Sequence, residues 1–370
     1  MPEPASVAAG IPMKCLFTHS GAVKMSELNR PQSNEKKRAG YVGLLAFCVV
    51  ALGLAGYWMS SAQKNAPTVI GKVTIAIPTQ VSSALMIVAS AQDLFKKAGV
   101  EVVNQPFLLG KEALNSLLDG KADLAVVADT PYILSLSNGS DIAIFAGISQ
   151  ARRALAIVAR IDRGITTIQD LDGKSIGVTP GTNMAYFTDA FLQVNRIASE
   201  KVKLVDMKTD EINNALKDGS IDAGVVFQPF LAKLELSMGD QIKVFHSEEV
   251  YAFRFLLVGK PSFIDQHPDE IRRVLTALIE ANEVIQMNPE AARKTVGEVV
   301  KLDDATMAKF FDPEDYVVTL DQAMLLALDD QTRWAMKRGI IKQGPVPNYV
   351  QVMKYQSLEA VRPSAVKVIR

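Results

Sequence analysis

Two stretches of this chain repeat one another at a nearly constant spacing. Residues 72–78 read Lys-Val-Thr-Ile-Ala-Ile-Pro, and residues 174–180 read Lys-Ser-Ile-Gly-Val-Thr-Pro, at an offset of 102. Residues 117–127 and 216–226 share a Leu-x-Asp-Gly helix ending followed by an aspartate and an apolar run, at an offset of 99. Chance is the alternative, since Leu-x-Asp-Gly is a common helix ending. The order of the two matches predicts two similar lobes.

Short apolar runs alternate with amphipathic helical patterns through the first repeat. The runs read as buried strands, at residues 72–77, 100–103, 122–127 and 142–145. Ser82 or Ser83 begins an apolar helical stripe that Gly99 terminates. A strand–helix–strand order favours parallel sheets covered by helices on both faces. After a returning run at residues 250–258 we expect helices only, packed against the first lobe.

The N-terminal part of the chain carries an uncharged apolar stretch at residues 41–59. About 20 apolar residues cross a bilayer as a helix, and Lys36, Lys37 and Arg38 directly precede the stretch. The positive-inside rule then predicts that residues 1–40 are a cytoplasmic tail and that everything after Met59 is extracytoplasmic, in the periplasm. An uncleaved membrane anchor and a signal helix cleaved near Ala62 are both compatible with this pattern.

Composition excludes several classes of function. Lysine plus arginine and aspartate plus glutamate each total 40, so nothing argues for a nucleic-acid partner. Cys15 and Cys48 both precede Ala62, which removes a cysteine nucleophile, a thiolate metal site and a disulfide from the body of the protein. No Gly-x-Ser-x-Gly, Gly-x-Gly-x-x-Gly or phosphate-loop motif occurs. We therefore expect no enzyme, no cofactor and no metal site.

Several motifs in a consistent order resemble one known family. Residues 117–131, 170–182, 221–230 and 267–272 are similar to nitrate/sulfonate/taurine-type substrate-binding proteins of ABC transporters. The resemblance covers about residues 72–300. It implies an α/β, two-lobed periplasmic-binding-protein fold of type II, with two parallel-type sheets, flanking helices and two crossovers. We place lobe 1 at residues 70–152 and 256–370, and lobe 2 at 153–255. Gln228 departs from the family, where many relatives carry Trp or Glu.

Ligands of open α/β sheets bind beyond the carboxyl ends of strands, at helix N-termini. Four loops meet this condition, at residues 79–83, 128–131, 181–183 and 227–229. Main-chain N–H groups and the helix dipole there favour a negative group, although ordinary helix capping is the alternative for each residue. The candidate ligand-binding residues are Thr79, Gln80, Ser82, Ser83, Asp129, Thr130, Gly181, Thr182, Asn183, Gln228 and Tyr251.

The charge of the ligand stays open at this point. Asp129 would repel an anion and favour an amine unless an arginine neutralises it, and Arg152, Arg153 and Arg254 are the candidates. A neutral heterocycle would instead stack on aromatic side chains such as Phe227 and Phe253. Nitrate, a sulfonate, taurine and a pyrimidine are all compatible with these residue types. The aromatic residues considered as stacking walls are Tyr132, Tyr186, Phe227, Tyr251 and Phe253.

These observations predict an extracytoplasmic solute-binding protein. It would capture a small polar anion, such as a sulfonate, taurine or nitrate, by closing its cleft and would deliver it to an ABC permease. Its partners would be the small-molecule ligand, the permease and, through the N-terminal helix, the membrane. One alternative is a membrane-anchored ligand sensor that signals to a partner. The other is a binder of a neutral pyrimidine-type heterocycle.

Overall fold

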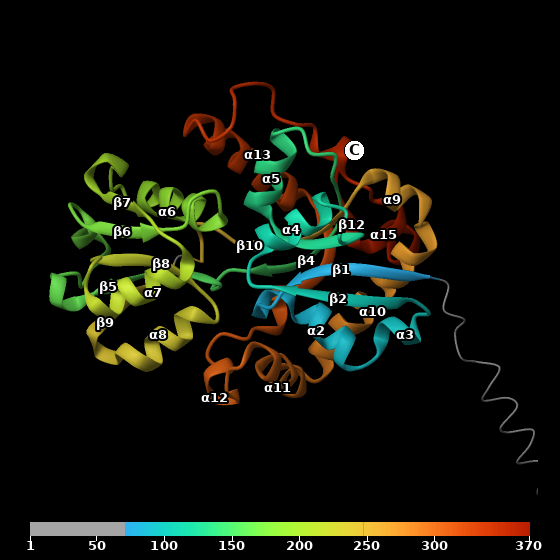
Figure 1. The fold of residues 1–370 in the computed structure, drawn as a ribbon, viewed down its shortest axis with the longest axis horizontal. Helices are drawn as coiled ribbons and strands as arrows, with labels where there is room; N and C mark the ends of the chain where they lie inside the picture. The colour runs from blue at the N-terminus through green and yellow to red at the C-terminus, as the bar shows by residue number, and fades with distance from the viewer. Residues whose placement is uncertain (1–70, 247) are drawn as a thin grey trace, which may run out of the picture. The chain divides into compact units, whose positions relative to one another are not determined.

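The computed structural model describes residues 71–246 and 248–370, which form two β-sheets with flanking helices (Figure 1). The first sheet has seven strands, which in spatial order are β12 (Val366–Lys367), β11 (Tyr316–Asp321), β4 (Ala143–Ala151), β10 (Phe253–Gly259), β3 (Leu124–Ala128), β1 (Lys72–Pro78) and β2 (Glu101–Phe107). The second has five, which are β7 (Lys203–Asp206), β6 (Ser175–Val178), β8 (Ala223–Phe227), β5 (Leu155–Arg160) and β9 (Ile242–Phe245). The two-lobed α/β fold is therefore confirmed.

Helices flank both sheets. Those of lobe 1 are α2 (Ala84–Ala91), α3 (Leu94–Lys97), α4 (Gly110–Leu118), α5 (Asp129–Ser137), α9 (Pro261–Gln266), α10 (Pro268–Met287), α11 (Pro289–Val300), α12 (Asp304–Met307), α13 (Gln322–Lys337), α14 (Tyr349–Val352) and α15 (Gln356–Val361). Those of lobe 2 are α6 (Asn183–Val194), α7 (Thr209–Asp218) and α8 (Phe230–Met238). The long helix α10 contacts α2, α3 and α15, so the C-terminal helices complete lobe 1.

The internal repeat corresponds to matching strand arrangements. In lobe 1, β2, β1 and β3 run parallel and β10 lies antiparallel beside β3. In lobe 2, β7, β6 and β8 run parallel and β5 lies antiparallel beside β8.

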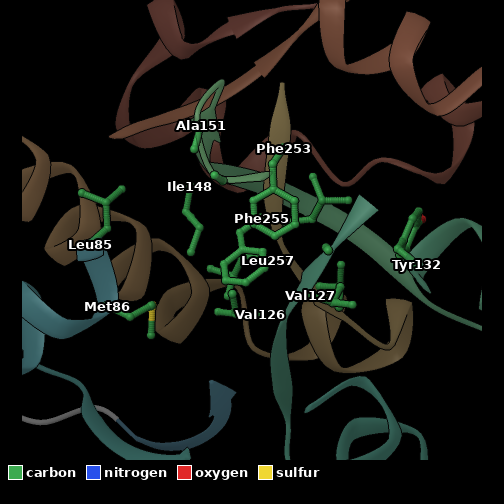
Figure 2. Close-up of a cluster of buried hydrophobic side chains, with 14 of the residues drawn as sticks. Leu85, Met86, Val126, Val127, Tyr132, Ile148, Ala151, Phe253, Phe255 and Leu257 are labelled. Atoms are coloured by element: carbon green, nitrogen blue, oxygen red, sulfur yellow. The ribbon is translucent and has the colours of Figure 1, made fainter. Parts of the chain in front are cut away.

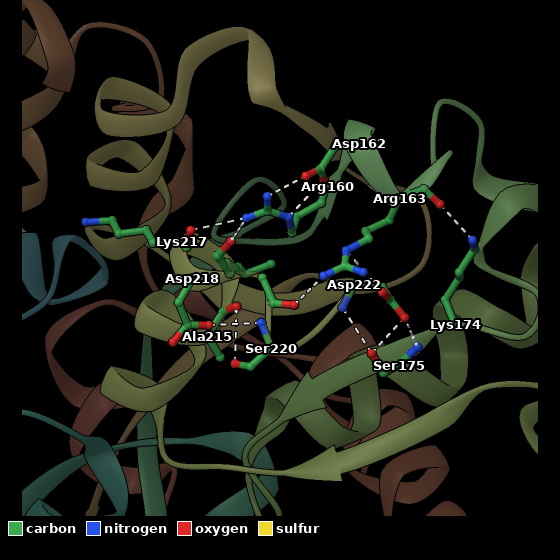
Figure 3. Close-up of polar contacts among 12 residues, drawn as sticks. Arg160, Asp162, Arg163, Lys174, Ser175, Ala215, Lys217, Asp218, Ser220 and Asp222 are labelled. Atoms are coloured by element: carbon green, nitrogen blue, oxygen red, sulfur yellow. Dashed lines mark hydrogen bonds and ion pairs between the residues drawn. The ribbon is translucent and has the colours of Figure 1, made fainter.

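The aspartate that occurs in both repeats, Asp123 in lobe 1 and Asp222 in lobe 2, makes the same hydrogen bond in each lobe. Asp123 Oδ2 accepts a hydrogen bond from the Thr74 N–H at 2.7 Å, and Asp222 Oδ2 accepts one from the Ser175 N–H at 2.9 Å. Figure 3 shows Asp222 between Ser175 and Arg163. Asp123 precedes β3 and bonds to β1, and Asp222 precedes β8 and bonds to β6. These contacts stabilise each sheet at the end of its strands opposite the candidate ligand loops.

Two details of the predicted fold are wrong. The sheets are mixed rather than parallel, because β10 runs antiparallel to both β3 and β4. One strand carries the chain out toward lobe 2 and the other carries it back, so the two must run in opposite directions. The C-terminal part also holds strands as well as helices, since β11 pairs with β4 and β12 pairs with β11.

The chain passes between the lobes through two short connections. The first is residues 152–154, between β4 and β5, and the second is residues 246–252, between β9 and β10. The Arg153 guanidinium lies 3.2 Å from the Glu248 carboxylate, so an ion pair joins the two connections. The sequence-based boundary at 152/153 falls in the first connection, whereas the one at 255/256 falls inside β10, which is paired in the sheet of lobe 1 from Phe253 onward.

The core of lobe 1 is built around β10 (Figure 2). Every residue of β10 is buried, and Phe253, Phe255 and Leu257 lie on the same face of the strand because strand side chains alternate between faces. Ile148 of β4 and Val127 of β3 lie in the same buried cluster. Each such side chain contributes about 1.5–3 kcal/mol by leaving water. The packing therefore holds the end of β10, which enters the candidate site, in a defined position.

The structure leaves the predicted N-terminal elements untested. The predicted cytoplasmic tail, residues 1–40, and the predicted membrane or signal helix, residues 41–59, lie outside the described residues. In the described part of the chain, no helix combines the length and the apolar character needed to span a bilayer.

Candidate ligand-binding site

A cavity of about 30 Å³ lies between the two lobes. It has room for roughly one or two water molecules. Lobe 1 lines it with Gln80, Leu109, Gly110, Lys111, Ala128, Pro131, Phe253 and Phe255. Lobe 2 lines it with Thr182, Asn183, Met184 and Phe227. Both lobes therefore contribute to one site.

Three helices begin at this cavity. Lobe 1 directs α4 and α5 toward it, and lobe 2 directs α6 toward it from the other side. The first N–H groups of a helix have no partner within the helix, and the aligned peptide dipoles leave partial positive charge there. At α5 the Thr130 N–H is bonded to the Asp129 carboxylate and Pro131 has no N–H, so it is the starts of α4 and α6 that favour a negatively charged group in the cavity.

The start of α6 is shaped by a cap and a glycine. Thr182 Oγ1 accepts a hydrogen bond from the Met184 N–H at 3.2 Å and donates one to the Thr179 carbonyl at 2.7 Å. Gly181, just before the cap, has φ +67°, a conformation that side chains with a Cβ rarely adopt. Together they hold the loop and the N-terminus of α6 against the cavity.

The start of α4 depends on a different property of glycine. A Cβ placed on Gly110 would lie 3.1 Å from the Ala128 nitrogen and 3.2 Å from the Val127 Cα. Only a residue without a side chain lets α4 begin this close to the end of β3. The close approach places the next residue, Lys111, at the cavity.

Lys111 is the one charged side chain among the cavity-lining residues. Its Nζ lies 3.7 Å from the position that a Cβ on Gly181 would occupy, so a cation of lobe 1 reaches the backbone of lobe 2. Sequence reasoning missed Lys111 because the loop after β2 was not counted among the ligand loops. The signal was present, since β2 also ends at the carboxyl edge of the sheet and a helix follows it.

Asp129 lies in a buried polar network rather than in the cavity lining. Its carboxylate is fully buried. Oδ1 accepts hydrogen bonds from the Tyr251 hydroxyl and, at 3.0 Å, from the Thr130 N–H, while Oδ2 accepts one from Gln331 Nε2 at 2.8 Å. Burial raises the pKa of Asp129, although the hydrogen bonds from Tyr251 and Gln331 and the charge of Arg254 act in the opposite direction.

The network joins three elements of lobe 1. Thr130 Oγ1 donates to Gln331 Oε1 at 2.5 Å and so links α5 to α13 within lobe 1, whereas Tyr251 belongs to the segment that connects β9 of lobe 2 to β10. Arg254 is buried on β10 and donates to the Ala252 carbonyl at 3.0 Å. Of Arg152, Arg153 and Arg254, only the charge of Arg254 acts to lower the pKa of Asp129, without a direct ion pair between the two side chains. Gln331 was not anticipated, because its partner lies 202 residues away in the sequence.

Three of the eleven candidate residues line the cavity, namely Gln80, Thr182 and Asn183. Gln80 Nε2 also donates to the Leu108 carbonyl at 2.9 Å, which anchors the loop that leads to α4. Gly181 directly precedes this lining. Among the proposed stacking walls, Phe227 and Phe253 reach the cavity.

The other candidates lie elsewhere. Ser83 Oγ donates to the Pro78 carbonyl at 2.6 Å, and Ser82 is buried beside it. Thr79 lines a separate apolar groove between β1, β2 and α2. Gln228 Oε1 accepts from the Ala232 N–H at 3.2 Å and thereby caps α8. The side chains of Ser83 and Gln228 therefore have structural partners.

A second contact joins the lobes through α6 and α13. The Tyr186 hydroxyl donates to Asp330 at 2.5 Å, and the Trp334 indole N–H donates to Asp189 at 2.7 Å. Arg338 Nε lies 2.8 Å from the same Asp189 oxygen. Tyr186 and Trp334 pack edge to face with ring centroids 5.4 Å apart. We call these five residues the α6–α13 contact; it joins the two lobes in this structure.

The NMT1/THI5-like family model matches residues 80–292. The chain belongs to the NMT1/THI5-like family. A Bacillus subtilis (strain 168) protein that carries the name of an aliphatic sulfonates-binding protein is 27% identical over 243 residues, which are 65% of this chain and 72% of that protein. The resemblance inferred from the sequence motifs is thereby confirmed.

Solved structures share the fold. The periplasmic aliphatic sulphonate binding protein SsuA from Escherichia coli matches with a TM-score of 0.68 at 15% identity, over 76% of this chain and 97% of that chain. The desulfurization enzyme DSZB matches with a TM-score of 0.63 at 15% identity, over 80% of this chain and 99% of that chain. The fold by itself is therefore shared by binding proteins and an enzyme.

Proposed function

We propose that this chain is an extracytoplasmic solute-binding protein that captures a small sulfonate-like organic anion and delivers it to an ABC permease. The observation that carries the proposal is the cavity between the lobes, where the N-termini of α4 and α6 meet Lys111. A sulfonate is ionised at neutral pH and offers three acceptor oxygens, which suits N–H donors and an ammonium group. The family and the names of the relatives support a sulfonate and a periplasmic location.

Capture proceeds by closure of the lobes. An organic anion does not fit a cavity of about 30 Å³, so the lobes separate to admit it. The ligand then favours the closed form, because only there does it touch the lining of both lobes. The connections at residues 152–154 and 246–252 act as the hinge, and the α6–α13 contact lowers the free energy of the closed form.

The test is a ligand panel measured by thermal shift and isothermal titration calorimetry. The panel contains 1-propanesulfonate, taurine, nitrate and a pyrimidine. A ligand at 100 times its Kd stabilises the protein by about 2.7 kcal/mol, which raises the Tm by a measurable amount. We expect a sulfonate to raise it most. If no member of the panel changes the Tm, the binding function is refuted, and a shift with the pyrimidine alone points to the heterocycle alternative.

Delivery to a permease needs its own test. We expect permease components to co-purify with the full chain from membranes, and more so when the sulfonate is present, because the closed form is the docking form. Co-purification with a signalling partner in place of a permease would argue for the sensor alternative.

A further inference from the structure

We infer that Lys111 sets the charge selectivity of the cavity, so that the site takes a monoanion with an apolar tail and discriminates against zwitterions such as taurine. The inference rests on the proposed function and names its ligand class. Three observations on the described residues support it: the lining carries one positive charge, it carries no negative charge, and its remaining walls are largely apolar.

Lys111 is the one charged residue in the lining of the cavity, within the part of the chain that the structure describes. The other polar side chains of the lining, Gln80, Thr182 and Asn183, are neutral. Among the described residues, Lys111 forms no ion pair, since no carboxylate lies within 4.0 Å of its Nζ. Its charge therefore remains available to a ligand.

An ammonium group of a ligand finds no opposite charge in this lining. Asp129, the carboxylate at the start of α5, has both oxygens occupied by Tyr251, Thr130 and Gln331 and lies near Arg254. A charge that leaves water without a partner is strongly disfavoured. Lys111 adds repulsion, since the amino group of taurine lies only two carbons from its sulfonate.

The remaining walls suit hydrocarbon. Phe253 and Phe255 of β10, Phe227 at the end of β8 and Met184 of α6 line the cavity beside the polar residues. An alkyl or aryl tail that packs against them gains free energy by leaving water, whereas an ammonium group in the same place loses it. The sulfonate end would face Lys111 and the helix N-termini, and the tail would face the phenylalanines.

Two ligands of equal size isolate the effect. 1-Propanesulfonate and taurine differ by one terminal group, a methyl in the first and an ammonium in the second. Calorimetry on the full chain should give at least tenfold tighter binding of 1-propanesulfonate. Replacing the lysine by a neutral side chain of similar length, Lys111→Met, should weaken 1-propanesulfonate about 10- to 100-fold and reduce the ratio between the two ligands.

A matched control and a salt titration complete the test. Lys121 lies near the other end of α4, pairs with Asp119 and does not line the cavity, so Lys121→Met should leave both affinities unchanged. Rising salt should weaken 1-propanesulfonate binding in the wild type and less so in Lys111→Met. Thermal unfolding verifies that both variants are folded, which is expected because both side chains are exposed.

The outcomes separate this inference from the proposed function. If both ligands bind but taurine binds as tightly, or Lys111→Met retains wild-type affinity and selectivity, the protein still binds sulfonates and the role of Lys111 is refuted. If neither ligand nor any other member of the panel binds to the wild type, the proposed function fails and this inference fails with it.

Discussion

Replacing Asp189 by alanine should weaken closure of the lobes by about 2 kcal/mol. Asp189 of α6 accepts one hydrogen bond from Trp334 at 2.7 Å and pairs with Arg338 at 2.8 Å, both at the C-terminal end of α13 in lobe 1. A hydrogen bond to a charged group contributes about 1.5–3 kcal/mol. The Arg338 side chain is 41% exposed, so water screens its pair and it adds less than about 1 kcal/mol. The other oxygen of Asp189 is buried without a partner, which offsets part of the gain.

The loss should appear as weaker ligand binding. Since about 1.4 kcal/mol corresponds to a tenfold change in an equilibrium constant, 2 kcal/mol corresponds to about 30-fold. The measured affinity is the intrinsic affinity of the closed form reduced by the fraction of protein that is closed. The full 30-fold effect is therefore expected when the closed form is the minor form of the ligand-free protein, and a smaller effect when it is the major form.

Tryptophan fluorescence reports the lobe contact directly. The sequence has two tryptophans, Trp58 and Trp334, so a Trp58→Phe background leaves only the indole in the α6–α13 contact. In that background, Asp189→Ala should shift the emission to longer wavelength, because the indole becomes more hydrated as the lobes open. Asp329→Ala is the matched control, since Asp329 pairs within α13 with Arg333 and not across the lobes.

The reasoning is refuted by a specific result. If Asp189→Ala retains wild-type emission and wild-type affinity for 1-propanesulfonate, the α6–α13 contact contributes nothing to closure. If the control Asp329→Ala produces the same shift, the change reflects the charge of α13 and not the bond between lobes.

Three further changes test other parts of the structure. Asp129→Ala should lower the free energy of unfolding in urea by about 1–3 kcal/mol for each buried donor left without an acceptor, Gln331 Nε2 among them; normal stability with altered ligand charge preference would contradict the buried network. Burial raises the pKa of Asp315 from 3.8 to about 7, so between these pH values the native state keeps a proton that the unfolded chain has released. The free energy of unfolding should therefore fall as the pH rises from about 4 to about 7. Asp315→Asn should make the free energy of unfolding less dependent on pH in this range. Gly181→Ala should cost about 1–2 kcal/mol at φ +67° and lower the Tm, and an unchanged Tm would argue against this backbone conformation.

The repeated motifs and the local signals for strands and helix starts were sufficient to predict the twin lobes. The apolar runs at residues 72–77 and 122–127 overlap the strands β1 and β3, and Thr182 caps a helix by contacts within its own turn. Because ligand loops follow such strands, Gln80, Thr182 and Asn183 could be placed at the site before the fold was known. Apart from the comparison of the two repeats, these features depend on residues that are close together in the sequence.

The tertiary structure decided which side chains meet. Asp129 follows a strand in the same way as the other candidates, but its carboxylate is bound by Gln331 from a helix 202 residues further along the chain. Lys111 reaches the cavity because Gly110 lets α4 approach β3, and β10 runs antiparallel because the chain must return from lobe 2. A sequence pattern specifies which face of an element is buried, whereas the partner of a buried charge depends on how distant elements pack.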